Sequence, residues 1–215
     1  MTDQSVPLDA VSAAVVRSGI VAILRAPTAD GFAAVADVLV GAGITALEVT
    51  LTSRGAIDAL AGLRRQLSDS VAVGVGTVLT ADDAKAAVDA GAEFLVSPVL
   101  DAGLVSGSGV PFYPGTLTPT EIFAAYRAGA PLVKLFPAAG LGPDYLKNVH
   151  GPLPDVKIMP TGGVKIEDIA DWLLAGASAV GVGGPLIGDA ASGGSLVALA
   201  ARARHAVSAV AFARS

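Results

Sequence analysis

The sequence has 215 residues, of which 53% are hydrophobic and 15% are charged, and its formal net charge is -5. A chain of this length can form one large α/β domain. It contains no cysteine, which excludes disulfides and cysteine-ligated metal sites. Because the chain is acidic and has no basic run, nucleic acid is not an expected partner, whereas a small anion can still bind backbone N–H groups.

Charged residues interrupt the apolar stretches before they reach membrane-spanning length. Arg17 and Arg25 bracket the first candidate, and Arg202 and Arg204 interrupt the last. A membrane helix needs about 20 predominantly apolar residues. The first residues, Met-Thr-Asp-Gln, lack the basic segment of a secretory leader. We therefore expect a cytoplasmic protein with no membrane partner.

Short apolar segments alternate with helical patterns along the chain. An amphipathic helix is expected at 7–18, a buried strand at 19–24 and a helix at about 30–41. Further strands are expected at 46–51, 71–75, 94–96, 111–113, 132–136, 157–159 and 179–182, and a last helix at about 195–213. Capping patterns at Thr80 and Thr118 mark two of the intervening helix starts.

Eight strands, each followed by a helix or helical turn, predict the fold class. The pattern favours an α/β protein, a compact (β/α)8 TIM barrel with an extra N-terminal helix. An open doubly wound sheet is the alternative. No linker or low-complexity tract is present, so residues 1–215 are expected to form a single domain.

A lysine lies in the middle of the apolar segment 131–137, PLVKLFP. Leu132, Lys134 and Phe136 share one face of the expected strand, and the other face is apolar. Burying an unpaired ammonium costs several kcal/mol, lowers the pKa of the lysine and makes its amine a usable nucleophile. From this strand alone, it is equally plausible that Lys134 reaches water or pairs with a buried acid.

A glutamate occupies the corresponding position in the second expected strand. If Leu47 and Val49 face the helices, Glu48 faces the barrel interior together with Ala46 and Thr50. An interior amine and carboxylate suit Schiff-base chemistry, in which the acid moves protons while the lysine is bonded to a carbonyl carbon. The alternative is a buried structural ion pair, which would gain little stability.

Two glycine pairs follow the seventh and eighth expected strands, Gly162-Gly163 and Gly183-Gly184. TIM barrels commonly bind phosphate in these two places, with backbone N–H groups. The alternative is that the glycines only allow tight turns with positive φ. The two histidines, His150 and His205, lack ligand spacing, so no metal site is expected.

Five motifs together resemble the class I 2-keto-3-deoxy-6-phosphogluconate (KDPG) aldolase family, which includes the 4-hydroxy-2-oxoglutarate aldolases. The resemblance covers about residues 15–190, with the motifs in order. They are LEVTL at 47–51, GVGTVL at 74–79, VSP at 96–98, VKLFP at 133–137 and MPTGG at 159–163.

This resemblance implies a (β/α)8 homotrimer that needs no metal or other cofactor. The implied reaction is reversible cleavage of a phosphorylated 2-keto-3-deoxy sugar acid, KDPG, to pyruvate and glyceraldehyde 3-phosphate. Lys134 would be the Schiff-base lysine and Glu48 the general acid/base. The implied substrate-binding residues are Arg25, Thr52 and Thr77 near the carboxylate, Pro98 and Phe136 lining the pocket, Thr161 near the C4 hydroxyl, and Gly162, Gly163, Gly183 and Gly184 at the phosphate.

The resemblance leaves the C4 epimer open. Thr52 stands where the gluconate branch commonly has an arginine, whereas Thr161 is typical of that same branch. The phosphogalactonate epimer and 4-hydroxy-2-oxoglutarate are therefore alternative substrates. Outside the family, the alternatives are a phosphosugar isomerase and a barrel that only binds a phosphorylated metabolite.

Overall fold

The computed structural model describes residues 6–215 of the chain. Residues 1–5 lie outside the described part. The expectation about a secretory leader falls on them, as does the start of the single domain expected over 1–215.

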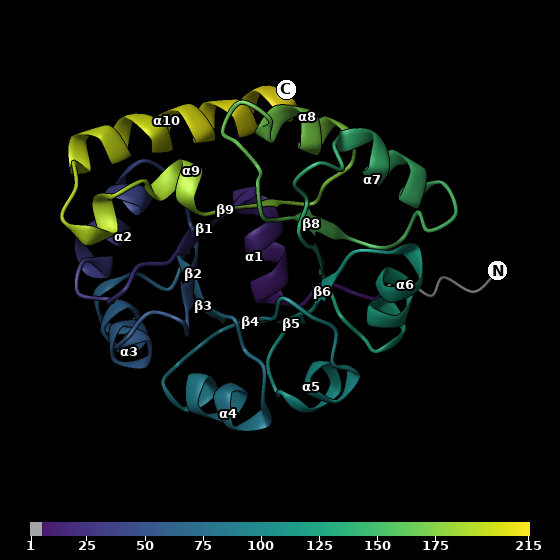
Figure 1. Ribbon diagram of the computed structural model, residues 1–215, viewed down its shortest axis with the longest axis horizontal. Helices are drawn as coiled ribbons and strands as arrows, with labels where there is room; N and C mark the ends of the chain where they lie inside the picture. The colour runs from purple at the N-terminus through teal and green to yellow at the C-terminus, as the bar shows by residue number, and fades with distance from the viewer. Residues whose placement is uncertain (1–5) are drawn as a thin grey trace.

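Helices and parallel strands alternate along the described chain (Figure 1). The strands are β1 (Ile20–Leu24), β2 (Ala46–Thr50), β3 (Ala72–Gly76), β4 (Leu95–Val96), β5 (Phe112–Tyr113), β6 (Gly115–Thr116), β7 (Val133–Leu135), β8 (Ile158–Pro160) and β9 (Val180–Val182). The helices are α1 (Ala10–Ser18), α2 (Phe32–Gly41), α3 (Ala56–Gln66), α4 (Ala81–Asp89), α5 (Ala102–Gly107), α6 (Pro119–Arg127), α7 (Pro143–His150), α8 (Ile169–Leu174), α9 (Gly184–Ile187), the 3-10 helix η1 (Ala190–Ser192) and α10 (Leu196–Ala213).

The strands form two parallel sheets, ordered β5-β4-β3-β2-β1-β9 and β6-β7-β8. Only Pro114 separates β5 from β6, because proline has no N–H to donate to a sheet. The strand expected at 111–113 therefore continues to Thr116 as two short pieces. Figure 1 shows the strands around the middle of the molecule with helices outside them, so the fold is α/β with parallel strands.

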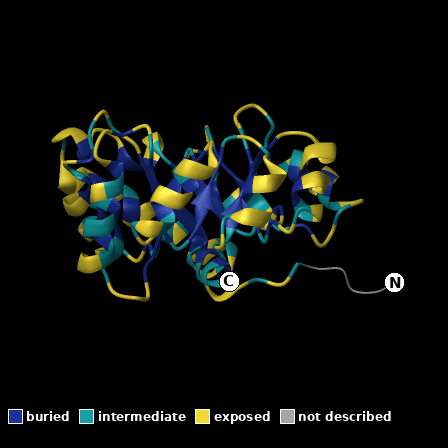
Figure 2. Cartoon of the chain, turned by 90° about the horizontal axis from the view of Figure 1, so that it is seen from below, coloured by how far each residue is buried: buried dark blue, intermediate teal, exposed yellow. Residues whose placement is uncertain are grey.

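Alternate residues of the strands belong to two different hydrophobic clusters. On β2, Ala46 lies in the inner cluster, whereas Leu47 and Val49 lie in the outer cluster beneath the helices. On β7, Val133 belongs to the outer cluster. The predicted facing of both strands is confirmed, and it places Glu48 and Lys134 on the inner side. Figure 2 shows the same buried centre, with strands in dark blue and exposed residues on the outer helices.

The helix expected at 7–18 is α1, which begins later because Asp9 caps it by accepting a hydrogen bond from the N–H of Ser12 at 2.8 Å. Val15 of α1 packs into the inner cluster. The Ser12 hydroxyl lies 3.0 Å from that of Tyr113, whose ring stacks on Phe94 at 5.3 Å. In Figure 1, α1 lies in the middle of the view, between the strands of the two sheets. It thus fills one end of the inner space.

The helix α10 is long and apolar enough to cross a membrane, by length and composition alone, and is the one such helix within residues 6–215. The sequence predicts no membrane-spanning segment if an uninterrupted uncharged run is required. The helix α10 contains Arg202 and Arg204 and so does not meet that criterion. It contacts α2, α8 and α9 (Figure 1) and buries Leu199 and Ala203. The same test is passed by helices that pack inside folded proteins.

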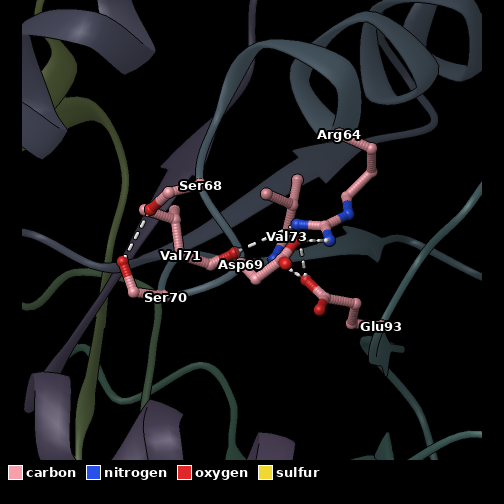
Figure 3. A network of polar contacts seen from close by, with 7 residues as sticks. All are labelled: Arg64, Ser68, Asp69, Ser70, Val71, Val73 and Glu93. Carbon is pink, nitrogen blue, oxygen red and sulfur yellow. Dashed lines mark hydrogen bonds and ion pairs between the residues drawn. The ribbon is translucent and has the colours of Figure 1, made fainter.

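A polar network at the start of β3 links three segments (Figure 3). The Glu93 carboxylate accepts a hydrogen bond from the N–H of Val73 at 2.8 Å and pairs with Arg64 at 3.0 Å. Arg64, on α3, also donates to the carbonyl of Val71 at 3.1 Å. The exposed Asp69 lies farther from Arg64, at 3.8 Å. Glu93 therefore fixes the beginning of β3 against α3.

Replacing Glu93 by alanine should lower the free energy of unfolding by about 2 kcal/mol, because the Val73 N–H and Arg64 lose their acceptor. Chemical denaturation measures this loss. The matched control is Asp69→Ala, which removes a carboxylate from the same network and should leave the unfolding midpoint unchanged. Equal losses in the two variants would contradict the role given to Glu93.

Candidate active site

Lys134 and Glu48 are both buried on the inner side of the strands, with 5% and 1% of their surface exposed. The Lys134 Nζ lies 4.9 Å from the centre of the Phe136 ring. Within residues 6–215, neither side chain takes part in an ion pair at 4.0 Å or less. The structural ion pair considered from the sequence is therefore not formed in the described chain.

The Glu48 carboxylate is buried with one oxygen unpaired. Its Oε2 has no hydrogen-bond partner among the described residues. Burial raises the pKa of Glu48, while the positive charges of Lys134 and Arg25 act in the opposite direction. The carboxyl group is thus biased toward its protonated form, and one of its oxygens is enclosed without a hydrogen-bond partner among the described residues.

The Lys134 amine is shifted in the complementary direction. Burial lowers its pKa, the Glu48 charge opposes this, and the Arg25 charge adds to the lowering. Both groups are therefore biased toward their neutral forms. A neutral amine can attack a carbonyl carbon, and a neutral carboxylic acid can donate the proton that this addition requires.

Glycines provide the space for the inward polar side chains. A Cβ on Gly76 of β3 would lie 1.8 Å from Oε1 of Glu48, and one on Gly181 of β9 would lie 2.4 Å from Oγ1 of Thr161. A Cβ on Gly74 would meet the ring of Phe94 at 2.4 Å. A side chain therefore does not fit at Gly74 or Gly76 without displacing its neighbours.

Arg25, Thr52 and Thr77 come together just beyond the ends of β1, β2 and β3. The Arg25 guanidinium donates to the hydroxyl of Thr52 at 2.9 Å and to that of Thr77 at 3.2 Å. Thr77 has a φ of 65°, the one left-handed non-glycine residue in the described chain. A β-branched residue is strained there, and such strain often accompanies function. The three side chains place one positive charge beside two hydroxyls.

The other predicted pocket residues also lie at the carboxyl ends of strands. Phe136 follows β7, and its ring would be 2.8 Å from a Cβ on Gly162. Thr161 follows β8 and is 2% exposed. Pro98 follows β4, and its carbonyl would be 2.2 Å from a Cβ on Gly115. This edge of the sheets carries the site in parallel α/β folds.

The two glycine pairs differ in conformation. Gly162 and Gly163 have φ values of 82° and 86°, as the tight-turn alternative requires, whereas neither Gly183 nor Gly184 has a positive φ. The N–H groups of all four glycines lack a protein acceptor within residues 6–215. Parallel pairing of Thr161 with Gly181 brings the ends of β8 and β9 together. The open N–H groups suit an anion.

Two residues that shape the site were not among the predicted site residues. Gly76 accommodates Glu48, and Ser53 accepts a hydrogen bond from the N–H of Ala26 at 3.1 Å, which joins the ends of β1 and β2. The sequence could have indicated Gly76, because an inward glutamate needs a small residue on the neighbouring strand. The sequence has no comparable signal for Ser53.

The fit of Glu48 over Gly76 gives a prediction. Gly76→Ala should lower the free energy of unfolding by about 1–3 kcal/mol, because the added methyl overlaps the carboxylate. Glu48→Ala in the same chain should remove most of this loss, as measured by denaturation of the two single variants and the double variant. Gly62→Ala is the control, since nothing lies within 4 Å of its added Cβ. If the double variant loses as much free energy of unfolding as the two single variants added together, the close contact between Glu48 and Gly76 is wrong.

Comparison with known proteins agrees with this geometry. Residues 11–195 match the family model described as KDPG and KHG aldolase. The chain is 33% identical over 171 residues to the 2-dehydro-3-deoxy-6-phosphogalactonate aldolase of Escherichia coli, covering 78% of this chain and 83% of that one. It is 41% identical over 145 residues to the 2-dehydro-3-deoxy-phosphogluconate aldolase of Pseudomonas aeruginosa, covering 64% of each.

A solved structure is similar over nearly the whole chain. It is the KDPG aldolase of Legionella pneumophila with pyruvate captured as a covalent carbinolamine intermediate. The TM-score is 0.83 at 28% identity, covering 91% of this chain and 97% of that one. The matched family model spans most of the sequence, and this protein belongs to the KDPG and KHG aldolase family.

Proposed function

We propose that the protein is a metal-independent class I aldolase that cleaves KDPG reversibly to pyruvate and glyceraldehyde 3-phosphate. The observation that carries the proposal is the buried Lys134 amine, which has a lowered pKa and no ion-pair partner within residues 6–215, on the same inner face as Glu48. An iminium on this lysine supplies the electron sink that breaking a carbon–carbon bond requires.

The reaction begins at the C2 carbonyl of the substrate. The Lys134 amine attacks C2, and one of its protons moves to the carbonyl oxygen to give a carbinolamine. Protonated Glu48 then gives its proton to the departing hydroxyl, so water leaves and an iminium forms. Glu48, now a carboxylate, takes the C4 hydroxyl proton directly or through a water. The C3–C4 bond breaks and the aldehyde leaves. The electron pair of the broken bond stays on the C3 side and forms an enamine. Glu48 returns the proton to C3. Water then hydrolyses the iminium, the bond between C2 and the Lys134 nitrogen breaks, pyruvate and the free amine form, and the released proton returns to Glu48.

The remaining site residues hold the substrate. Arg25, with Thr52 and Thr77, binds the carboxylate, and the charge-assisted hydrogen bonds of the guanidinium suit this group. Phe136 and Pro98 line the pocket, and Thr161 lies near the C4 hydroxyl. The phosphate is bound by open N–H groups, those of Gly162, Gly163, Gly183 and Gly184.

The relatives support the formation of a covalent bond between pyruvate and the enzyme. They leave two C4 epimers, the phosphogluconate and the phosphogalactonate, as candidate substrates. The Legionella pneumophila structure holds pyruvate as a carbinolamine. The Pseudomonas aeruginosa relative is named for the gluconate and the Escherichia coli relative for the galactonate. Thr52 accepts from Arg25 where the gluconate branch commonly has an arginine, and this favours the galactonate or 4-hydroxy-2-oxoglutarate as a second candidate.

Within this proposal the chain forms a closed (β/α)8 barrel. Two contacts between the sheets support closure. At the junction of β5 and β6, the Pro114 carbonyl accepts a hydrogen bond from the N–H of Lys134 at 2.9 Å. At the junction of β8 and β9, Thr161 forms a parallel bridge with Gly181. We also propose that the whole chain is one domain, that it assembles as a homotrimer and that it acts in the cytoplasm, as inferred from the family resemblance and the sequence.

The test is reduction with borohydride in the presence of pyruvate, followed by intact mass and peptide mapping. A reduced pyruvyl adduct on Lys134, absent in Lys134→Met, is the expected result. Glu48→Gln should still form the adduct but cleave substrate about 10²–10⁴-fold more slowly, because it lacks the acid and base. Rates on both C4 epimers and on 4-hydroxy-2-oxoglutarate then identify the substrate.

An absent adduct in folded wild-type protein would remove the aldolase proposal. A phosphosugar isomerase would then convert its substrate without attachment to Lys134. A barrel that only binds phosphorylated metabolites would retain affinity and release no pyruvate.

A further inference from the structure

A single arginine from α10 holds the short helix that follows β9. The Arg202 Nε donates to the carbonyl of Leu186 at 2.7 Å, and its Nη2 donates to that of Ile187 at 2.9 Å. These are the last two residues of α9. Within residues 6–215, Arg202 has no ion pair with a carboxylate at 4.0 Å or less. Its partly buried guanidinium is therefore directed at this helix.

The helix α9 needs such support, because it has only four residues. The N–H groups of Leu186 and Ile187 both donate to the carbonyl of Gly183 at 2.9 Å, and the N–H of Gly188 donates to that of Gly184 at 2.8 Å. An isolated helical turn is unstable in water, since it fixes several dihedrals for few hydrogen bonds. Contacts from other elements must therefore maintain its position.

The guanidinium also lies against the turn at the end of α9. Gly188 has a φ of 57°, and a Cβ there would be 2.8 Å from Nη2 of Arg202. Leu186 and Ile187 are buried, so the hydrophobic side of α9 is packed inside while Arg202 holds its last carbonyls. Figure 1 shows α9 between α10 and the ends of β1 and β9.

We infer that Arg202 is a positioning residue for the phosphate group of the substrate. It fixes α9 and thereby the N–H groups of Gly183 and Gly184, which begin this segment. The inference rests on the proposed function and adds a determinant of substrate class, namely phosphorylated over unphosphorylated 2-keto acids. Arg202 itself touches neither the substrate nor Lys134.

The test compares Arg202→Met with Arg204→Met. Both variants remove one arginine from α10, but Arg204 is exposed and makes no hydrogen bond to α9. For Arg202→Met, the KM for the phosphorylated substrate should rise about tenfold, because the N–H groups are no longer held in place. The kcat/KM for 4-hydroxy-2-oxoglutarate, which has no phosphate, should stay within about twofold.

Two further readouts separate positioning from general damage. The Ki of inorganic phosphate as a competitive inhibitor should weaken in parallel with the KM, and the thermal shift produced by inorganic phosphate should shrink. Pyruvate trapping on Lys134 should be unchanged. Arg202→Lys, which keeps the charge and can donate to one carbonyl, should give a smaller change in the same direction. This variant decides the matter if Arg202→Met does not fold.

Loss of activity in equal proportion on both substrates, or an unchanged KM ratio and phosphate Ki in folded variants, would overturn the inference. Wild-type protein run alongside keeps the two proposals distinct. If it neither traps pyruvate nor cleaves substrate, the proposed function fails. If it does both and the Arg202 variants match Arg204→Met, only the role of Arg202 is wrong.

Discussion

The site depends on the burial of two ionisable groups that do not neutralise each other by direct contact. Lys134 and Glu48 are almost fully enclosed, and neither forms an ion pair at 4.0 Å or less among the described residues. Desolvation then dominates the titration of both, lowering the pKa of the amine and raising that of the acid. A contact ion pair would have favoured the charged forms and made the amine a poor nucleophile. The fold therefore sacrifices some stability at this site and obtains a reactive pair.

The surrounding structure makes this burial possible. Glycines opposite the inward side chains leave room for them, as at Gly76 beneath Glu48. The helix α1 fills the far end of the inner space through Val15 and the Ser12–Tyr113 contact, while Arg25, Thr52 and Thr77 lie beyond the carboxyl ends of β1, β2 and β3. The open glycine N–H groups lie beyond the carboxyl ends of β8 and β9. In the proposed function the Arg25 guanidinium and these N–H groups bind the carboxylate and the phosphate of one substrate.

Much of the fold follows from the sequence pattern, because strand alternation reports which face a residue occupies. The pattern correctly placed Leu47 and Val49 on the helix side and Glu48 opposite them. The capping boxes at Thr80 and Thr118 correctly marked the starts of α4 and α6. Periodicity does not encode distance across the structure, so the absence of a contact ion pair had to be seen in three dimensions. The hydrogen bonds from Arg202 to α9 were likewise hidden, since a charged residue in an apolar helix predicts only that it reaches a polar group.

The most direct test of the buried reactive pair is the pKa of Lys134 itself, measured by NMR titration of lysines labelled at Nζ. Lys134→Met assigns the signal. Lys134 should titrate below the ordinary pKa of a lysine side chain. Glu48→Gln should lower its midpoint further, because the variant removes the negative charge that favours the ammonium. A Lys134 midpoint at or above the ordinary lysine value would mean that the amine is stabilised in its charged form, and the account of the site would be wrong.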